Sequence, residues 1–250
     1  MTTTPVMQAE NIVKELGAGA GLVVAVKGVS LELVPGELTL LMGPSGSGKT
    51  TLLSILGCIM KPTSGSIRIA DTKIDGLSAE ELAKVRREHL GFIFQSYNLF
   101  PTLNAIENVR IALDVRGVKG FAATSRSEEV LREVGLGHRL TNYPRNLSGG
   151  EQQRVAVARA IASSPSIVLA DEPTAALDSE NGHAVMALLS RIAKEQHRSV
   201  LAVTHDPRTL GYADRVVRIE DGRIVGEERR PEGIDSPEIT DLTKRRKLHA

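Results

Sequence analysis

Residues 43–50 form a glycine-rich octapeptide, GPSGSGKT, whose residue types suit the binding of phosphate groups. It matches the pattern G-x-x-x-x-G-K-[ST], in which glycines let backbone N–H groups turn toward phosphate oxygens without Cβ clashes. We expect Lys49 to reach the β- and γ-phosphates of a nucleoside triphosphate, and the hydroxyl of Thr50 to bind Mg²⁺. The alternative, a turn that binds nothing, is disfavoured by the buried strand before it and the apolar helical run after it. The expected phosphate-binding residues are Gly43, Pro44, Ser45, Gly46, Ser47, Gly48, Lys49, Thr50 and Thr51.

Two adjacent carboxylates, Asp171 and Glu172, follow the apolar run SIVLA at residues 166–170. That run predicts a buried strand, and ligands of an open α/β sheet bind at the carboxyl ends of its strands. We expect Asp171 to hold Mg²⁺, directly or through water. We expect Glu172 to act as the general base for the water that attacks the γ-phosphate. The alternative is a pair on the surface, which the preceding apolar strand and the P-loop disfavour.

Two single residues after apolar strands are further catalytic candidates. His205 follows the run SVLAV at 199–203 and is expected to contact the γ-phosphate and orient the water. A structural or capping histidine is the alternative. Gln95 follows the run GFIF and is a candidate to complete the Mg²⁺ shell, although a glutamine in this position is ordinarily unremarkable.

A second helix start with two glycines, LSGGEQQ, begins at residue 147. Ser148 and Glu151 form a capping box, which predicts a helix that runs to about residue 163. Glycines at a helix N-terminus offer backbone N–H groups to an anion, so this is another phosphate-binding surface. A chain with a P-loop does not need a second cradle for the same nucleotide. One explanation is that it serves the nucleotide of a neighbouring copy.

Apolar runs and turn signals predict the elements that position these residues. Strands are expected at 22–35, 38–42, 66–70, 166–170 and 199–203, with a hairpin turn at Asp221-Gly222. Helices are expected at 79–88, behind a capping box of Ser78 and Glu81, within 105–135, and at 180–196. The loop at 17–21 is expected to be flexible, with no clear strand leading into it. Strands that alternate with helices predict an α/β fold with a parallel sheet, interrupted by a helical lobe.

The composition limits the partners and the compartment. The 31 basic and 30 acidic residues leave a net charge of +1, so no attraction toward nucleic acid is expected. The single cysteine, Cys58, lies in an apolar stretch, which favours a buried structural thiol in a reducing compartment. We find no signal peptide and no apolar run of about 18 residues, the length that a membrane span needs. The chain is expected to be cytoplasmic and to reach a membrane only through a partner.

The segment LSGGEQQ, in order with the other motifs, resembles the signature of the ABC ATPases. The resemblance covers about residues 8–228 and implies an α/β P-loop NTPase fold. That fold has a RecA-like parallel-sheet core, an N-terminal antiparallel β portion and an inserted helical lobe. It implies one ATPase domain at 1–228, with its core at about 5–95 and 164–228 and its lobe at about 96–163. A polar tail at 229–250 follows; its basic cluster at 244–247 is expected to be solvated, with anionic lipid contact as the alternative.

The resemblance also assigns a role to each motif. It implies ATP and Mg²⁺ as ligands, and a head-to-tail dimer in which two ATP molecules lie at the interface. Each ATP is held by the P-loop of one copy and by the signature of the other, so that ATP closes the dimer and hydrolysis opens it. The family residues found here are the signature Leu147, Ser148, Gly149, Gly150 and Glu151, the Q-loop Gln95, the D-loop Asp178, the switch His205, and Asp171 with Glu172.

Within the family, FQSYNLFPTLNAIENV and ADEPTAALDS resemble the lipoprotein-release and macrolide-export branch, with the DevA-type exporter ATPases nearest. This branch implies a subunit that powers export or release of a lipid, lipoprotein or small molecule. The route is a separate membrane-spanning permease, often joined by a periplasmic adaptor. The subunit is expected at the inner face of the cell membrane. Aromatic residues around Gln95 either fill the core of the lobe or form a socket for a permease helix; the docking candidates are Tyr97, Leu99 and Phe100.

One departure from the family pattern concerns the base of the nucleotide. No aromatic residue precedes Phe92, and Leu16 or a neighbour occupies the region where the family commonly stacks an aromatic ring on adenine. Loose base selectivity is expected. A soluble or division-linked ABC ATPase that acts as a regulatory interaction module is the alternative function, which co-purification with a membrane protein would distinguish. A simple P-loop kinase or GTPase does not account for LSGGEQQ.

Overall fold

The computed structural model describes residues 4–230, and a six-stranded sheet forms its centre. The strand order is β10-β9-β3-β8-β7-β6, and all neighbours are parallel except β9 and β10. The bounds are β3 Leu38–Met42, β6 Leu90–Ile93, β7 Ile167–Asp171, β8 Ser199–Thr204, β9 Arg215–Glu220 and β10 Arg223–Arg229. The strands predicted at 38–42, 166–170 and 199–203 are confirmed as β3, β7 and β8, as is the hairpin at Asp221-Gly222.

The central strands are apolar on both faces because each face is covered. Successive side chains of a strand point to opposite faces, so alternate residues join different cores. Leu40, Ala170 and Ala202 belong to a core shared with the helices of the lobe, which we call the α5-side core. Leu41 and Leu169 belong to the second core, which contains α1 (Lys49–Leu56) and which we call the α1-side core. The sheet therefore separates two independent sets of packing contacts.

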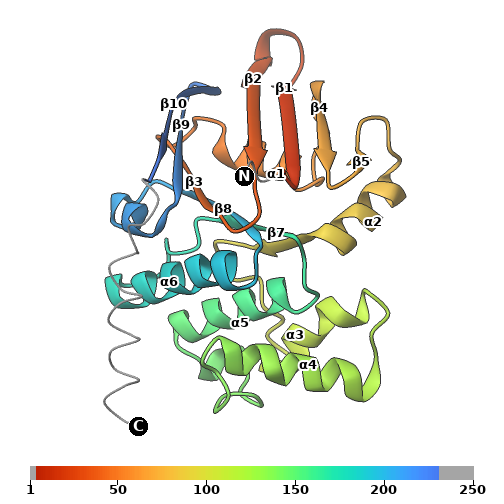
Figure 1. Ribbon diagram of the computed structural model, residues 1–250, viewed down its shortest axis with the longest axis vertical. Coiled ribbons are helices and arrows are strands. Elements are labelled where there is room, and N and C mark those ends of the chain that lie inside the picture. The colour runs from red at the N-terminus through yellow and green to blue at the C-terminus, as the bar shows by residue number, and fades with distance from the viewer. Residues whose placement is uncertain (1–3, 231–250) are drawn as a thin grey trace.

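A second sheet closes the α1-side core. It is antiparallel, with four strands in the order β2-β1-β4-β5. The bounds are β1 Met7–Leu16, β2 Val23–Leu33, β4 Ser64–Ile69 and β5 Thr72–Lys73. Figure 1 shows β1, β2 and β4 of this sheet at the top, with β7 and β8 of the six-stranded sheet below them and β9 and β10 at the upper left. α1 contacts β2 of one sheet and β7 and β8 of the other. The arrangement confirms the α/β P-loop fold with an antiparallel N-terminal portion.

The expectation that no strand leads into the loop at 17–21 is wrong. β1 runs directly into it and pairs with β2, so the loop is the end of a hairpin. The sequence of β1, MQAENIVKEL, hides the strand because its alternation is broken: register shifts occur between Ala9 and Val13, and Asn11 has φ of 51°. Such bulges change which residues face the core and erase the period of two.

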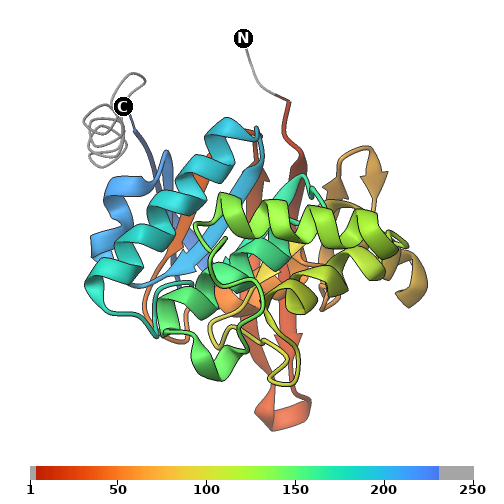
Figure 2. The same cartoon turned by 90° about the horizontal axis from the view of Figure 1, so that it is seen from below.

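Helices cover the other face of the central sheet. α3 (Ala105–Asp114), α4 (Gly120–Glu133) and α5 (Gly149–Ile161) pack on one another, and α5 also contacts β6 and α6 (Ser179–Glu195). Figure 2, seen from below, shows these helices in front of the sheet. The predicted helices at 79–88 and 180–196 are confirmed as α2 (Ala79–His89) and α6, and both predicted capping boxes are present.

The C-terminal hairpin extends further than the composition indicates. β10 includes Arg229, which was assigned to a tail. Arg229 Nη1 lies 3.1 Å from Glu37 Oε2, and Arg215 Nη2 lies 2.9 Å from Glu227 Oε2, so a network of charges holds this end to β3 and β9. Arg229 therefore belongs to the folded domain. The rest of the expected tail from residue 231, with the cluster at 244–247, lies outside the described residues. Within residues 4–230, no helix combines the length and apolar character needed to span a bilayer.

Candidate functional site

The P-loop connects β3 to α1, and its backbone rather than its side chains shapes it. Gly48 caps α1 with φ of 96°, a left-handed conformation that favours glycine. A Cβ there would lie 2.3 Å from the carbonyl oxygen of Ala25, so the close approach of β2 also requires glycine. No side chain caps the N-terminus of α1. Its first-turn N–H groups thus lack a side-chain acceptor, as an anion-binding helix start requires.

Lys49 is buried within this loop although it carries a charge. Its ammonium group donates hydrogen bonds to the carbonyl oxygens of Gly43 at 2.8 Å and Pro44 at 2.7 Å. The side chain therefore lies across the loop, with its charge among backbone dipoles. A cation in this position attracts an anion that the loop N–H groups surround.

The turn of the β9–β10 hairpin contacts the P-loop, and the P-loop motif alone does not predict this contact. The N–H of Gly222 donates to the carbonyl of Ser47 at 3.1 Å, and the carbonyl of Gly222 accepts from Lys27 N at 2.8 Å. The hairpin, β2 and the loop are thus joined through one residue. Sequence reasoning identified Gly222 as a turn residue only.

Asp171, the last residue of β7, faces the P-loop. It follows Ile167 and Leu169 at intervals of two, and these face the α1-side core. The hydroxyl of Thr50 donates to Asp171 Oδ1 at 3.3 Å, as expected for two ligands of one ion. Burial raises the pKa of Asp171, which the Thr50 hydrogen bond and Lys49 partly oppose. A hydroxyl and a half-buried carboxylate are the hard oxygen ligands that Mg²⁺ takes, so the residues fit this ion.

Glu172, directly after β7, has its backbone in the left-handed region that non-glycine residues rarely adopt. Its φ is 46°, and its N–H donates to the carbonyl of Val203 on β8 at 3.0 Å. Glu172 Oε1 lies 2.8 Å from His205 Nδ1. An ionised carboxylate can only accept, so the ring proton lies on Nδ1 when the pair forms. The structure therefore brings together the expected base and the expected switch histidine.

Gln95 follows β6 at the edge of the central sheet. It is exposed two residues beyond β6, the edge strand that pairs with β7 through Ile93 and Ala170. Within residues 4–230, no hydrogen bond joins Gln95 to Thr50 or Asp171. We call residues 43–51 with Asp171, Glu172 and His205 the P-loop half-site. Gln95 follows β6 at the same edge of the sheet, without a hydrogen bond to this half-site among the described residues.

The signature residues 147–151 form a differently built helix start. The hydroxyl of Ser148 accepts from Glu151 N at 3.2 Å, and Glu151 Oε2 accepts from Ser148 N at 2.8 Å. Arg139 Nε donates to the other carboxylate oxygen of Glu151 at 2.8 Å. The helix that follows, α5, belongs to the α5-side core, whereas α1 belongs to the other one. The helices that follow the P-loop and the signature segment therefore pack on opposite faces of one sheet.

The D-loop residue Asp178 belongs with the signature. It caps α6 by accepting from Asn181 N at 2.9 Å and from Asn181 Nδ2 at 2.8 Å. The same Asn181 side chain packs on Gly150: a Cβ on that glycine would lie 2.1 Å from Asn181 Oδ1. We call residues 147–151 with Asp178 the signature half-site. Asn181, which the sequence did not single out, joins its two parts.

The docking candidates differ in their surroundings. Phe100 is 49% exposed, whereas Leu99 packs against the α5-side core. Phe92 packs against the α1-side core, so the alternative that places this aromatic in the core of the lobe is wrong. Tyr97 has φ of 60°, and its carbonyl accepts from Arg159 Nη2 of α5 at 2.8 Å. Its hydroxyl lies beside Gly149, so this loop touches the signature helix.

The region expected to meet the nucleotide base carries aliphatic side chains. Leu16, Leu22 and Val23 are exposed at the tip of the β1–β2 hairpin. β2 then passes the P-loop at Ala25. Loose base selectivity stays a prediction.

A family model described as ABC transporter matches residues 26–175. The macrolide export ATP-binding/permease protein MacB of Escherichia coli (strain K12) is 43% identical over 241 residues, 96% of this chain and 37% of that protein. The Shigella flexneri protein of the same name gives the same values. The chain thus spans only 37% of the length of these relatives.

Solved structures extend the likeness to three dimensions. The dimeric ATP-binding cassette MJ0796, in a post-hydrolysis state bound to ADP and Pi, superposes with a TM-score of 0.82 at 40% identity. The match covers 89% of this chain and 98% of that one. A second structure, described as a dimeric bacterial ABC transporter cassette, gives the same values.

Proposed function

The chain belongs to the ABC transporter family, and from this premise we propose that two copies of it hydrolyse two ATP molecules at a shared interface to drive transport. One observation carries the proposal. The P-loop half-site and the signature half-site lie on helices that pack on opposite faces of the central sheet. A single chain therefore offers two phosphate-binding surfaces that do not face each other. In a head-to-tail pair, the P-loop half-site of one chain faces the signature half-site of the other, so each site is completed by the second chain.

In the P-loop half-site, binding comes first. Backbone N–H groups of residues 46–51 and the ammonium group of Lys49 surround the β- and γ-phosphates. Thr50, Asp171 and Gln95 would hold Mg²⁺. When bound, Mg²⁺ neutralises charge on the phosphate oxygens.

Hydrolysis needs a base and a fixed water. Glu172 accepts the proton of the attacking water, and His205 holds the Glu172 carboxylate in place through Nδ1. Ser148, Gly149 and Gly150 of the second copy donate to the γ-phosphate across the interface, near Asp178. Only the closed dimer makes both sets of contacts, so ATP favours closure and its hydrolysis favours opening.

The test of this proposal is Glu172→Gln, which keeps the size of the side chain and removes the base. We expect ATP binding to persist, kcat to fall by roughly 10²–10⁴-fold, and the dimer to accumulate with ATP. ATPase assays and analytical ultracentrifugation measure these effects. Glu195→Gln, an exposed carboxylate at the opposite end of α6, is the matched control and should behave as wild type. A Glu172→Gln protein that stays monomeric with full activity would contradict the role of the base.

For transport, we propose a separate membrane-spanning permease as partner, with a periplasmic adaptor and a lipid, lipoprotein or small molecule as cargo. The names of the MacB relatives join an ATP-binding and a permease part, which supports this choice. This chain would then lie at the inner face of the cell membrane. Co-purification of a polytopic membrane protein with the native chain is the expected result. A native complex with soluble proteins alone would favour the regulatory alternative.

The segment of Tyr97, Leu99 and Phe100 is the proposed docking site. Phe100 is half exposed while its backbone is fixed: Asn108 Oδ1 accepts from Phe100 N at 2.8 Å, and Asn108 Nδ2 donates to Phe100 O at 3.1 Å. A side chain presented this way suits a helix of a partner. Phe100→Ala should lower permease-stimulated ATPase more than ATP binding, and equal losses of both would contradict the docking role.

A further inference from the structure

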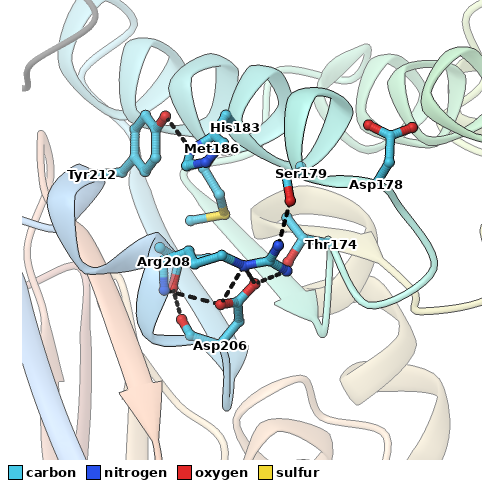
Figure 3. Close-up of a pocket in the computed structure, with 10 residues that line it drawn as sticks. Thr174, Asp178, Ser179, His183, Met186, Asp206, Arg208 and Tyr212 are labelled. Carbon is cyan, nitrogen blue, oxygen red and sulfur yellow. Dashed lines mark hydrogen bonds and ion pairs between the residues drawn. The ribbon is translucent and has the colours of Figure 1, made fainter.

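A small pocket lies between α6, the turn after β7 and the segment after β8 (Figure 3). Its cavity volume is about 10 Å³, room for about one water molecule. It cannot take a nucleotide. The side chains that line it belong to the two segments that carry His205 and Asp178.

Arg208 spans this pocket from one segment to the other. Its Nε donates to Asp206 Oδ1 at 2.9 Å, and its Nη2 donates to Asp206 Oδ2 at 2.7 Å. Its Nη1 donates to the hydroxyl of Ser179 at 2.5 Å. Figure 3 shows the guanidinium between these two partners, with Asp178 pointing away from it. We call Arg208, Asp206 and Ser179 the Arg208 clasp.

One end of the clasp fixes the turn that carries His205. Asp206 N donates to Thr204 Oγ1 at 3.0 Å, and Thr204 is fully buried at the end of β8. The carbonyl of Asp206 accepts from Thr209 Oγ1 at 2.7 Å. His205 therefore stands between two anchored residues. Asp206 thereby restrains the backbone from which the His205 imidazole reaches Glu172.

The other end reaches the signature half-site. Ser179 is the first residue of α6 and directly follows Asp178. Asp178 is bonded to Asn181, and Asn181 packs on Gly150. A continuous line of contacts thus runs from Gly150 through the start of α6 and Arg208 to His205. It joins the two half-sites inside one chain, although they serve different ATP molecules in the proposed dimer.

We propose that Arg208 is a positioning residue that ties the orientation of His205 to the docking of the signature half-site on a second copy of this chain. The inference rests on the proposed function and adds a route by which engagement of one ATP site aligns the other. Contact of the partner at Asp178 and Gly150 fixes the start of α6. Arg208 passes that restraint to Asp206 and hence to His205.

A positioning role for Arg208 and a role in folding stability predict effects of different size on kcat and on the melting temperature. Arg208 is 55% exposed, and ion pairs of exposed side chains contribute little to folding. Loss of the clasp should therefore leave the fold intact. Alignment of a base and its partner is more demanding, because small displacements of reacting groups reduce rates strongly. The predicted signature is a lower kcat without a lower melting temperature.

The experiment compares Arg208→Ala with Arg132→Ala in ATPase assays on the full chain. The two arginines are matched: Arg132 is 57% exposed and lies 2.7 Å from Glu128, and Arg208 lies 2.7 Å from Asp206. We expect Arg208→Ala to lower kcat by about tenfold, with KM for ATP and the melting temperature unchanged. Arg132→Ala should match wild type in all three. Arg208→Lys should recover part of kcat, because an ammonium group can keep one of the two contacts.

A double-mutant cycle isolates the link to α6. Ser179→Ala should lower kcat severalfold, and Arg208→Ala with Ser179→Ala should be no worse than Arg208→Ala alone. Additive losses, or an unchanged kcat in Arg208→Ala while the wild type hydrolyses ATP, would overturn the clasp and leave the proposed function standing. A wild-type chain that binds no ATP and does not hydrolyse it would overturn the proposed function and the clasp together.

Discussion

The two helix starts of this chain, at α1 and at α5, differ in how their first-turn N–H groups are satisfied. At α1, Gly48 adopts a left-handed conformation and no side chain caps the helix. At α5, Ser148 and Glu151 form a capping box that already occupies two backbone N–H groups. A buried lysine is added at α1, whereas an arginine at α5 pairs with the capping glutamate. The first start is open to phosphate, and the second is largely satisfied on its own.

The difference indicates an order of events. A start with free N–H groups and a cation binds triphosphate by itself. A capped start offers one hydroxyl and glycine N–H groups, too little to hold ATP alone but enough to recognise ATP already bound. We therefore propose that the P-loop half-site binds ATP first and that the signature half-site of the partner then recognises the bound ATP. Variants in each half-site distinguish ATP binding from recognition of bound ATP.

The largest expected effect is on nucleotide binding and follows Lys49→Ala. The change removes charge-assisted hydrogen bonds to phosphate, so ATP affinity should fall about a hundredfold. Ser148→Ala should leave the affinity of the monomer for ATP unchanged. Calorimetry with a non-hydrolysable ATP analogue measures both. Equal losses in the two variants would erase the distinction between the half-sites.

Gly150→Ala should affect dimerisation rather than binding. The new Cβ would lie 2.1 Å from Asn181 Oδ1, so the start of α5 or the Asn181 side chain must move. ATP-driven dimer and kcat should fall by about tenfold to a hundredfold, with ATP affinity kept. Adding Asn181→Gly removes the amide and also the Asn181 Cβ, which would lie 3.0 Å from the new methyl group, and should recover part of the lost dimer. Failure of this rescue would contradict the contact between the signature and α6.

Ser148→Ala and Ser78→Ala form a matched pair. Each serine caps a helix within a capping box, at α5 and at α2. Each change should lower the free energy of unfolding by about 1 kcal/mol. Only Ser148→Ala should also reduce ATP-driven dimerisation, because α2 has no part in the proposed interface. A similar loss of dimer in Ser78→Ala would show that the effect comes from stability alone.

The smallest expected effect concerns pH. The backbone N–H of Ser148, with Arg139, holds the pKa of Glu151 below its ordinary value. A depressed folded pKa stabilises the fold above the unfolded pKa of about 4.3, and this contribution is lost as pH falls through the folded pKa. Glu151→Gln should therefore be less stable than wild type at pH 7, with the gap closing in acid. Denaturant unfolding at several pH values measures it; a gap that widens in acid would contradict the sign.

The sequence predicted the elements and motifs that are local. These patterns depend only on neighbours within a few residues, so they can be recognised in the sequence. They are the P-loop, the acidic pair and the capping boxes at Ser78 and Ser148. The buried parallel strands can be predicted too, because a strand that is covered on both faces is a continuous apolar run. β1 was not predicted, because bulges break the alternation of its apolar and polar residues.

Contacts between distant segments could not be predicted in the same way. Gly222 beneath the P-loop, Asn181 against Gly150 and Arg208 on Ser179 each join residues far apart in the chain. Their residue types are ordinary for a turn, a helix start and a surface, so nothing local distinguishes them. The fold alone brings each pair together.

Mixing two inactive variants tests most directly whether the half-sites complete each other between chains. Lys49→Ala lacks a working P-loop, and Ser148→Arg blocks the signature, so each alone should not hydrolyse ATP. In an equal mixture, half the dimers are mixed and each holds one intact composite site, so roughly a quarter of wild-type activity should return. If the mixture stays as inactive as its components while both variants remain folded and dimerise with wild type, completion between chains is contradicted.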